Sequence, residues 1–243
     1  MSKFRYFKET HNAAFALAAV APLLLLYEAG IVLYFRRLNP ESQIEIRNAA
    51  EVFLKNILAM VGITSNWVQV SLYFAVTGFV IILHKKKHGS LHLRHLGICL
   101  IESLVYATFL GYLAKEFTRF ILSLQVGWQQ QAIDMMPDLL QAVGAGIYEE
   151  LLFRLIMMGS LLILFRQLLP DKIGIQAAIA LIVSSLIFAV FHYVSWESVT
   201  WQSFFFRFFA GLILGVIFLT RNFAVAVYTH AFYDILFWLQ GRF

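Results

Sequence analysis

Three short motifs in the C-terminal half of the sequence hold side chains whose types could carry out chemistry together. The first has two adjacent carboxylates and an arginine, the second a histidine, and the third a histidine and an aspartate: Glu149, Glu150, Arg154, His192, His230 and Asp234. A carboxylate beside an imidazole can take a proton from water, and the hydroxide can attack a carbonyl carbon. A donor imidazole can stabilise the oxyanion that forms. These residue types therefore favour hydrolysis at a carbonyl group.

The spacing within the first motif separates its two carboxylates. Glu150 and Arg154 are four residues apart, so on a helix they share a face and stand in the right order for an ion pair. Glu149 is turned away from Glu150 by about 100° on the same helix. An ion pair accounts for Glu150 and Arg154 as structural residues but leaves Glu149 without a partner. We therefore expect a functional role for Glu149.

The third motif repeats this spacing, because His230 and Asp234 also share a helix face. A lone histidine among aromatic residues is usually a hydrogen-bonded core residue, and that interpretation applies to His192 and His230 taken separately. Lipid offers no hydrogen bonds, however, so polar groups on several membrane spans must satisfy one another. The three motifs are therefore predicted to converge on one water-filled pocket.

Signatures of three classes of intramembrane protease are missing from the sequence. It has neither the Gly-x-Ser-Gly of rhomboid-type serine proteases nor the His-Glu-x-x-His of site-2-type metalloproteases. Presenilin-type proteases need two intramembrane aspartates, and only Asp234 lies clearly within an apolar run. What the sequence does contain is a glutamate that could act with imidazoles.

The composition of the 243 residues is that of a polytopic membrane protein. Hydrophobic residues make up 60% and charged residues 14%, and the mean hydropathy is +0.75. Soluble domains have about half apolar and about a quarter charged residues. The net charge of +5 does not indicate a nucleic-acid partner, because the cations lie mostly between apolar runs, where basic residues contact lipid headgroups.

Seven apolar runs approach or exceed the roughly 20 residues that a helix needs to cross a bilayer. They cover residues 13–35, 66–83, 96–114, 138–165, 173–194, 203–220 and 223–240. The sequence therefore predicts an all-α, multi-pass membrane protein with about seven transmembrane helices. Positive charges favour the cytoplasm, and an N-terminus inside places ten Lys and Arg residues there against eight outside.

Two segments are predicted to lie along the membrane interface. The first, 41–62, is expected to be an amphipathic helix or, less favourably, an eighth span, and the second covers 119–133. Polar residues in the first recur at helical spacing, which is typical of a face in contact with headgroups: Glu45, Asn48, Glu51, Lys55 and Asn56.

A histidine cluster lies in and beside the basic segment 84–95. Its spacing is similar to that of a metal site, but Gly89 and Ser90 interrupt it and lysines surround it: His84, His88, His92 and His95. We interpret this segment as a loop that faces headgroups.

The three motifs, in this order and on successive spans, resemble those of the CPBP family. That family groups type II CAAX prenyl proteases with bacteriocin-processing and Abi-type proteins. The matching patterns are Glu149-Glu150-x-x-x-Arg154, Phe188-x-x-x-His192 and His230-x-x-x-Asp234, with a glycine-containing helix, 208–215, between the last two. The resemblance covers about 138–240, which divides the chain into N-terminal membrane helices with an amphipathic segment (1–137) and a CPBP-like catalytic core (138–243).

The resemblance implies an intramembrane glutamic endopeptidase with no catalytic metal and no cofactor. By analogy, Glu149 and His192 activate water, Glu150 and Arg154 support the first motif, and His230 with residue 234 forms the oxyanion site. The substrate would be a membrane-anchored protein or peptide, in a bacterial or archaeal cell membrane. The family has Asn or Asp at position 234, and an ionised Asp234 would repel an oxyanion, so this residue is expected to be protonated or to orient His230.

Three other functions fit some of these residues. A proton-coupled transporter could relay protons through Glu28, Glu102 and the pocket, although the sequence lacks paired Gly/Pro-broken spans. A metal enzyme could use the histidines and carboxylates as ligands. A non-proteolytic immunity or scaffold protein with a CPBP-like core is the third.

Overall fold

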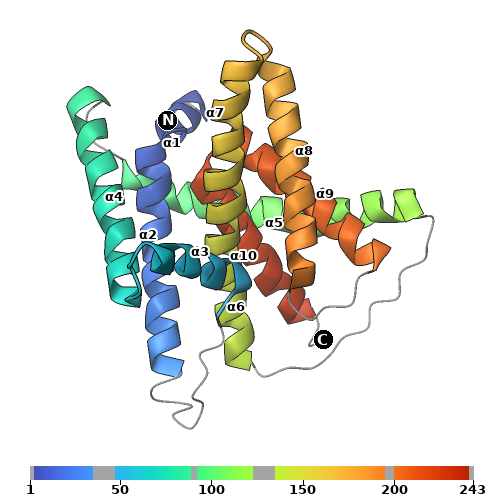
Figure 1. Ribbon diagram of the computed structural model, residues 1–243, viewed down its shortest axis with the longest axis horizontal. Helices are drawn as coiled ribbons and strands as arrows, with labels where there is room; N and C mark the ends of the chain where they lie inside the picture. Colours follow the sequence, from blue (N-terminus) through green and yellow to red (C-terminus); the bar gives the residue numbers. More distant parts are fainter. Residues whose placement is uncertain (1–2, 35–46, 89–91, 123–134, 195–199, 241–243) are drawn as a thin grey trace.

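The computed structural model describes residues 3–34, 47–88, 92–122, 135–194 and 200–240, which form helices and short connections (Figure 1). These residues contain no strand. The longer helices are α1 (Lys3–Thr10), α2 (Ala13–Leu33), α3 (Ala49–Met60), α4 (Asn66–His88), α5 (Leu96–Leu122), α6 (Met135–Glu150), α7 (Gly159–Leu168), α8 (Ile173–Phe191), α9 (Trp201–Thr220) and α10 (Phe223–Gln240). Three short helical stretches are η2 (Leu93–His95), η3 (Leu151–Met158) and η4 (His192–Val194).

The helices confirm an all-α, multi-pass membrane protein. Among the described residues, six are long and apolar enough to cross a membrane: Ala13–Leu33, Asn66–Lys86, Leu96–Leu122, Leu139–Leu168, Ile173–Phe191 and Trp201–Thr220. The seventh expected span is a shorter apolar helix, Phe223–Leu239. The span predicted to end at 114 continues to Leu122, so the first residues of the proposed interfacial piece 119–133 belong to α5, and 123–133 lie outside the described residues.

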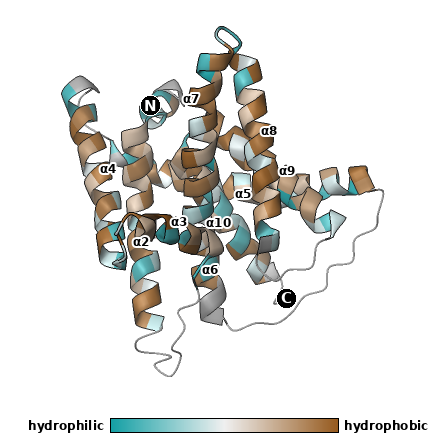
Figure 2. Cartoon of the chain, in the orientation of Figure 1, coloured by the Kyte–Doolittle hydropathy of each residue, from teal (hydrophilic) through white to brown (hydrophobic). Residues whose placement is uncertain are grey.

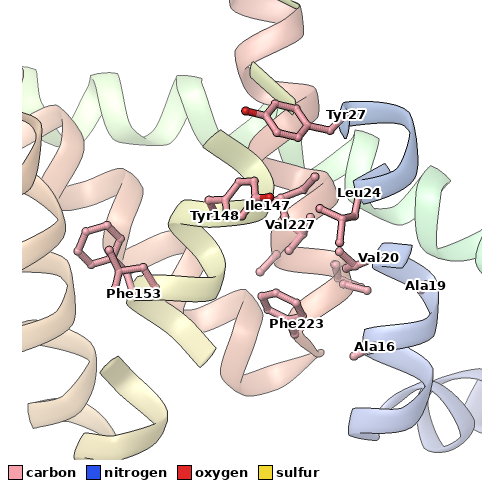
Figure 3. Close-up of a cluster of buried hydrophobic side chains, with 14 of the residues drawn as sticks. Ala16, Ala19, Val20, Leu24, Tyr27, Ile147, Tyr148, Phe153, Phe223 and Val227 are labelled. Atoms are coloured by element: carbon pink, nitrogen blue, oxygen red, sulfur yellow. The ribbon is translucent and has the colours of Figure 1, made fainter. Parts of the chain in front are cut away.

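The core lies where α10 packs against α2, α5, α6 and α9. Figure 3 shows part of it, with side chains from α2, α6 and α10 meeting at their facing surfaces. Small residues on α10 allow this close packing, and its run 224–227 is fully buried. A Cβ on Gly146 of α6 would lie 2.8 Å from the backbone oxygen of Val227 and 2.8 Å from the backbone nitrogen of Ala231. Glycine at 146 therefore brings the helix of Glu149 directly against the helix of His230.

Helix α3 is amphipathic, but part of the polar face that we predicted to meet headgroups is buried. In Figure 1 it lies across the more upright α2 and α6, and in Figure 2 it carries both hydrophilic and hydrophobic residues. Asn48 and Glu51 are buried against the bundle, whereas Val52, Ile57 and Met60 are exposed. Asn48 and Glu51 therefore face other polar groups inside the protein, whereas Asn56 is exposed.

The length of α3 also decides between the two alternatives for the segment 41–62. The helix has 12 residues, which is too short to cross a bilayer, so the described part provides no eighth span. Residues 41–46 lie outside the described residues.

Within the histidine segment, His95 does not face headgroups as we predicted, and residues 89–91 lie outside the described residues. His95 is fully buried, and its Nε2 atom lies 2.7 Å from Oε2 of Glu9. The Nδ1 atom of His92 lies 3.5 Å from the same oxygen. These contacts hold α1 against the start of α5, and a hydrogen bond of 2.6 Å from Tyr6 Oη to Oε2 of Glu102 holds it further along that helix.

Candidate active site

A π-helical stretch follows directly after the two adjacent glutamates. Glu149 and Glu150 end α6, η3 contains Arg154, and α7 continues the same run to Leu168. The backbone N–H of Gly159 reaches the carbonyl oxygen of Arg154, five residues earlier, which is the hydrogen-bond pattern of a π-helix. Such stretches are rare and occur often at functional sites.

The ion pair expected from the spacing is present and fully buried. Nε of Arg154 lies 3.1 Å from Oε2 of Glu150. The same guanidinium donates from Nη2 to the backbone oxygen of Gly211, at 3.2 Å, and lies 4.5 Å from the centre of the Phe188 ring. One arginine thereby joins the helix of the glutamates to α8 and α9.

The glycines of α9 allow it to pack closely against α8. A Cβ on Gly211 would lie 3.1 Å from Cβ of Ser185 in α8, and a Cβ on Gly215 would clash with Leu181 of α8. This close approach also leaves the carbonyl group of Gly211 available to Arg154.

His230 lies closer to Glu150 of α6 than to Asp234, with which it shares a helix face. Its Nδ1 atom lies 2.8 Å from Oε1 of Glu150, whereas its Nε2 atom is 3.6 Å from Oδ2 of Asp234. Nε2 is also 3.8 Å from Oε2 of Glu149. Because a carboxylate accepts a hydrogen bond and does not donate one, Nδ1 of His230 carries a hydrogen and donates a hydrogen bond to Glu150. The other ring nitrogen faces the remaining two carboxyl groups.

Glu149 uses its two oxygens differently. Oε1 accepts a hydrogen bond of 2.9 Å from Nδ2 of Asn48. Oε2 lies 3.6 Å from Nε2 of His192 and makes no direct hydrogen bond to the described residues. His192 donates from Nδ1 to the backbone oxygen of Phe188, at 2.8 Å, so its Nε2 atom is left with a lone pair. Distances of this length between polar atoms are those that one water molecule can bridge.

All six residues singled out from the sequence therefore lie in one connected cluster, formed by α6, η3, η4 and α10. The sequence did not identify a seventh, Asn48, which was assigned to a headgroup-facing surface. Asn48 and Glu149 are 101 residues apart, and no local spacing relates them. The one available signal was the unpaired state of Glu149, which required a donor from somewhere in the fold.

An apolar cavity of about 310 Å³ lies beside this cluster, between α2, α3, α4 and the helix of the glutamates. Leu54 and Leu58 of α3 form part of its wall, and Tyr148, Leu152 and Ile156 form another part. Its volume is within the range of about 300–1,000 Å³ typical of small-molecule sites. Within the described part of the chain, no three His, Cys, Asp or Glu side chains are arranged to hold a metal ion.

Comparison with known protein families adds one finding to this geometry. Residues 133–236 match the family described as type II CAAX prenyl endopeptidase Rce1-like. The match covers 104 of the 243 residues and supports the resemblance of this part of the chain to the CPBP family. The match includes all six residues of the predicted cluster but not Asn48. No curated protein and no solved structure matches the chain. The matched family is one of CAAX-type proteases, and the apolar helices make this protein an integral membrane protein of several spans.

Proposed function

We propose that this protein cleaves a peptide bond of a membrane-anchored substrate with a water activated by Glu149 and His192. The observation that carries the proposal is the position of Oε2 of Glu149. It lies 3.6 Å from Nε2 of His192 and 3.8 Å from Nε2 of His230, and none of the described residues donates a hydrogen bond to it. A water between Glu149 and His192 would have a base on one side and a fixed imidazole lone pair on the other.

The proposed reaction moves one proton through Glu149. Its carboxylate takes a proton from the water, and the hydroxide oxygen forms a bond to the carbonyl carbon of the scissile peptide. The carbonyl π electrons move to the oxygen, which becomes an oxyanion. When the tetrahedral intermediate collapses, the C–N bond breaks and Glu149 returns the proton to the leaving nitrogen. The products are a carboxylic acid and an amine, which at neutral pH become a carboxylate and an ammonium group, and Glu149 is again ionised.

His230, protonated on both ring nitrogens, and Asp234 are suited to donate hydrogen bonds to the oxyanion. Nε2 of His230 and Oδ2 of Asp234 lie 3.6 Å apart, so both can approach one substrate oxygen. The pairing of Nδ1 with Glu150 already orients His230, and Asp234 is not needed for that task. We therefore assign Asp234, in its protonated form, as a second donor to the oxyanion.

Replacing Asp234 by Asn distinguishes a donor from a carboxylate that orients His230. Removing an oxyanion donor lowers kcat by about 10²–10³-fold, whereas Asn keeps a donor, so Asp234→Asn is expected to lose much less. Its activity should also persist to higher pH than that of the parent, because an amide cannot ionise. The measurement is the pH–rate profile of the purified variant in liposomes. A severe loss at every pH would contradict the donor role and assign Asp234 to the orientation of His230.

The cavity suggests where an apolar part of the substrate binds. Its walls are almost wholly apolar, and Tyr148, the chain neighbour of Glu149, forms part of them. The matched family acts on prenylated proteins by its description. We propose that the substrate is a protein with an isoprenylated C-terminus and that its lipid chain occupies this cavity.

The test compares two peptides that end in the same C-a-a-X sequence, one farnesylated on cysteine and one unmodified. Protein in liposomes is expected to release the C-terminal tripeptide from the farnesylated peptide at the higher kcat/KM, as measured by mass spectrometry. Leu58→Trp fills the cavity and should lower kcat/KM for the farnesylated peptide. The control Leu104→Trp changes an exposed leucine of α5 that does not line the cavity. Equal cleavage of both peptides, or an equal effect of the two tryptophans, would contradict the prenyl assignment.

A further inference from the structure

We infer that Asn48 is a positioning residue for Glu149, so that α3 supplies part of the active site from outside the segment that matches the family. The inference rests on the proposed function, because it takes Glu149 as the base. It concerns a side chain that the matched residues 133–236 do not contain. The argument depends on two hydrogen bonds of one amide group and on the contacts that hold α3 in place.

The first hydrogen bond fixes the orientation of the Asn48 amide. Asn48 is the N-cap residue of α3, and its Oδ1 atom accepts a hydrogen bond of 2.8 Å from the backbone N–H of Ala50. Only the oxygen of the amide can serve as this cap. The Nδ2 atom must therefore point the other way, where it donates to Oε1 of Glu149 at 2.9 Å. Helix capping thus determines which end of the amide faces the carboxylate.

The second hydrogen bond determines how Glu149 presents its carboxylate. With Oε1 held by Asn48, the other oxygen is the one directed at the two histidines, His192 and His230. Without this donor, the carboxylate would be free to rotate about its terminal torsion, which has broad energy wells. Such rotation would reduce the fraction of molecules in which Oε2 lies opposite His192. Asn48 is buried, with 9% of its surface exposed, so bulk water is a poor substitute for it.

Helix α3 is anchored strongly enough to make Asn48 a fixed donor. Its fully buried Glu51 forms ion pairs with Arg47 and Lys55 and accepts a hydrogen bond from the hydroxyl of Tyr27 in α2. Nη1 of Arg47 also lies 3.5 Å from Oε2 of Glu28, which is in α2 like Tyr27. Buried ion pairs are costly to break because they leave a charge without a partner. This ionic cluster holds the first turn of α3 against α2, and the turn carries Asn48.

Two substitutions separate positioning from helix capping. Asn48→Ser keeps a capping side chain, but serine is too short to reach Glu149 from that position. Asn48→Asp also keeps the cap and places a second carboxylate against Oε1 of Glu149. We expect Asn48→Ser to lower kcat about 10–100-fold with little change in KM, because it alters the orientation of a proton-transfer group. In Asn48→Asp, the acid limb of the pH–rate profile is expected to move to higher pH, because like charges disfavour ionised Glu149.

Asn12 provides the matched control. It is the N-cap residue of α2 and accepts a hydrogen bond of 2.8 Å from the backbone N–H of Phe15, but it does not contact the active-site cluster. Asn12→Ser and Asn12→Asp are therefore expected to have the parental kcat and pH–rate profile. All variants are measured as full-length protein in liposomes, together with their thermal unfolding.

The outcomes distinguish this inference from the function on which it rests. Parental kcat in Asn48→Ser, or a parental pH–rate profile in Asn48→Asp, would overturn the role of Asn48 if Glu149→Gln is inactive. Equal losses in the Asn12 and Asn48 variants would overturn it as well, because capping alone would then explain them. Parental activity in Glu149→Gln would overturn the proposed base and, with it, the positioning of that base.

Discussion

Replacing Glu149 by Gln is expected to lower the rate of peptide cleavage by about 10²–10⁴-fold, the contribution typical of a general base. Gln has nearly the same shape but cannot take a proton from water. Its side-chain oxygen can still accept the hydrogen bond from Asn48 that Oε1 of Glu149 accepts now. The variant should therefore insert, purify and unfold like the parent.

The measurement is single-turnover cleavage in liposomes, combined with thermal unfolding in detergent. Glu116→Gln makes the same chemical change on α5, at a side chain that is 43% exposed and lies outside the cluster, and it should leave both quantities unchanged. A Glu149→Gln protein that cleaves at the parental rate would show that another group is the base. A variant that fails to fold would show that Glu149 is a structural residue.

Replacing Arg154 by Leu is expected to lower the free energy of unfolding by about 3–5 kcal/mol, the usual cost of leaving one member of a buried ion pair alone. Arg154 is 1% exposed and Glu150 is fully buried, so water cannot take over the role of the guanidinium. Activity should fall as well, because Glu150 also holds Nδ1 of His230. SDS titration and thermal unfolding measure the first effect, and the cleavage assay measures the second.

A matched surface pair and a double variant provide the controls for Arg154. Arg119 and Glu116 form an ion pair whose side chains are 40% and 43% exposed, and such pairs contribute only about 0–1 kcal/mol. Arg119→Leu should therefore have little effect on unfolding. The double variant Glu150→Gln/Arg154→Leu removes the isolated charge but keeps an acceptor for His230, so it should be more stable than Arg154→Leu alone. If it is not, the isolated charge is not the cause of the loss.

The helices and the local pairs could be predicted from the sequence because both depend on nearby residues. Uninterrupted apolar runs predicted the spans, and the spacing of Glu150 and Arg154 predicted an ion pair that lies within one helix. The same spacing places His230 and Asp234 on one helix face, 3.6 Å apart, but it does not reveal a competing partner on another helix. A glutamate 80 residues away is the nearer partner. Spacing along a helix shows which pairs are possible but not which partner a neighbouring helix supplies.

Amphipathic patterns have a further ambiguity in a membrane protein. In a soluble protein the polar face of a helix meets water, but in a bilayer it can meet either headgroups or other polar groups inside the protein. Glu51 and Asn48 form hydrogen bonds with polar groups inside the protein, and His95 contacts Glu9 in the same way. The sequence correctly identified these faces as polar, and only the packing of α3 on α2 and α6 determines that they are buried.

The π-helical stretch η3 makes one helix of this protein tolerant of changes in chain length. Each residue of an α-helix turns the chain by about 100°, so losing one residue from the middle of α8 would move everything beyond it to another face. In Leu151–Met158 the wider turns hold surplus residues. Losing one residue after Arg154, such as Ile156, would let these hydrogen bonds contract to the ordinary i→i+4 pattern. Because α7 would then present the same face relative to α6, a single-residue deletion should be survivable in η3 after Arg154 and not in the regular turns beside it.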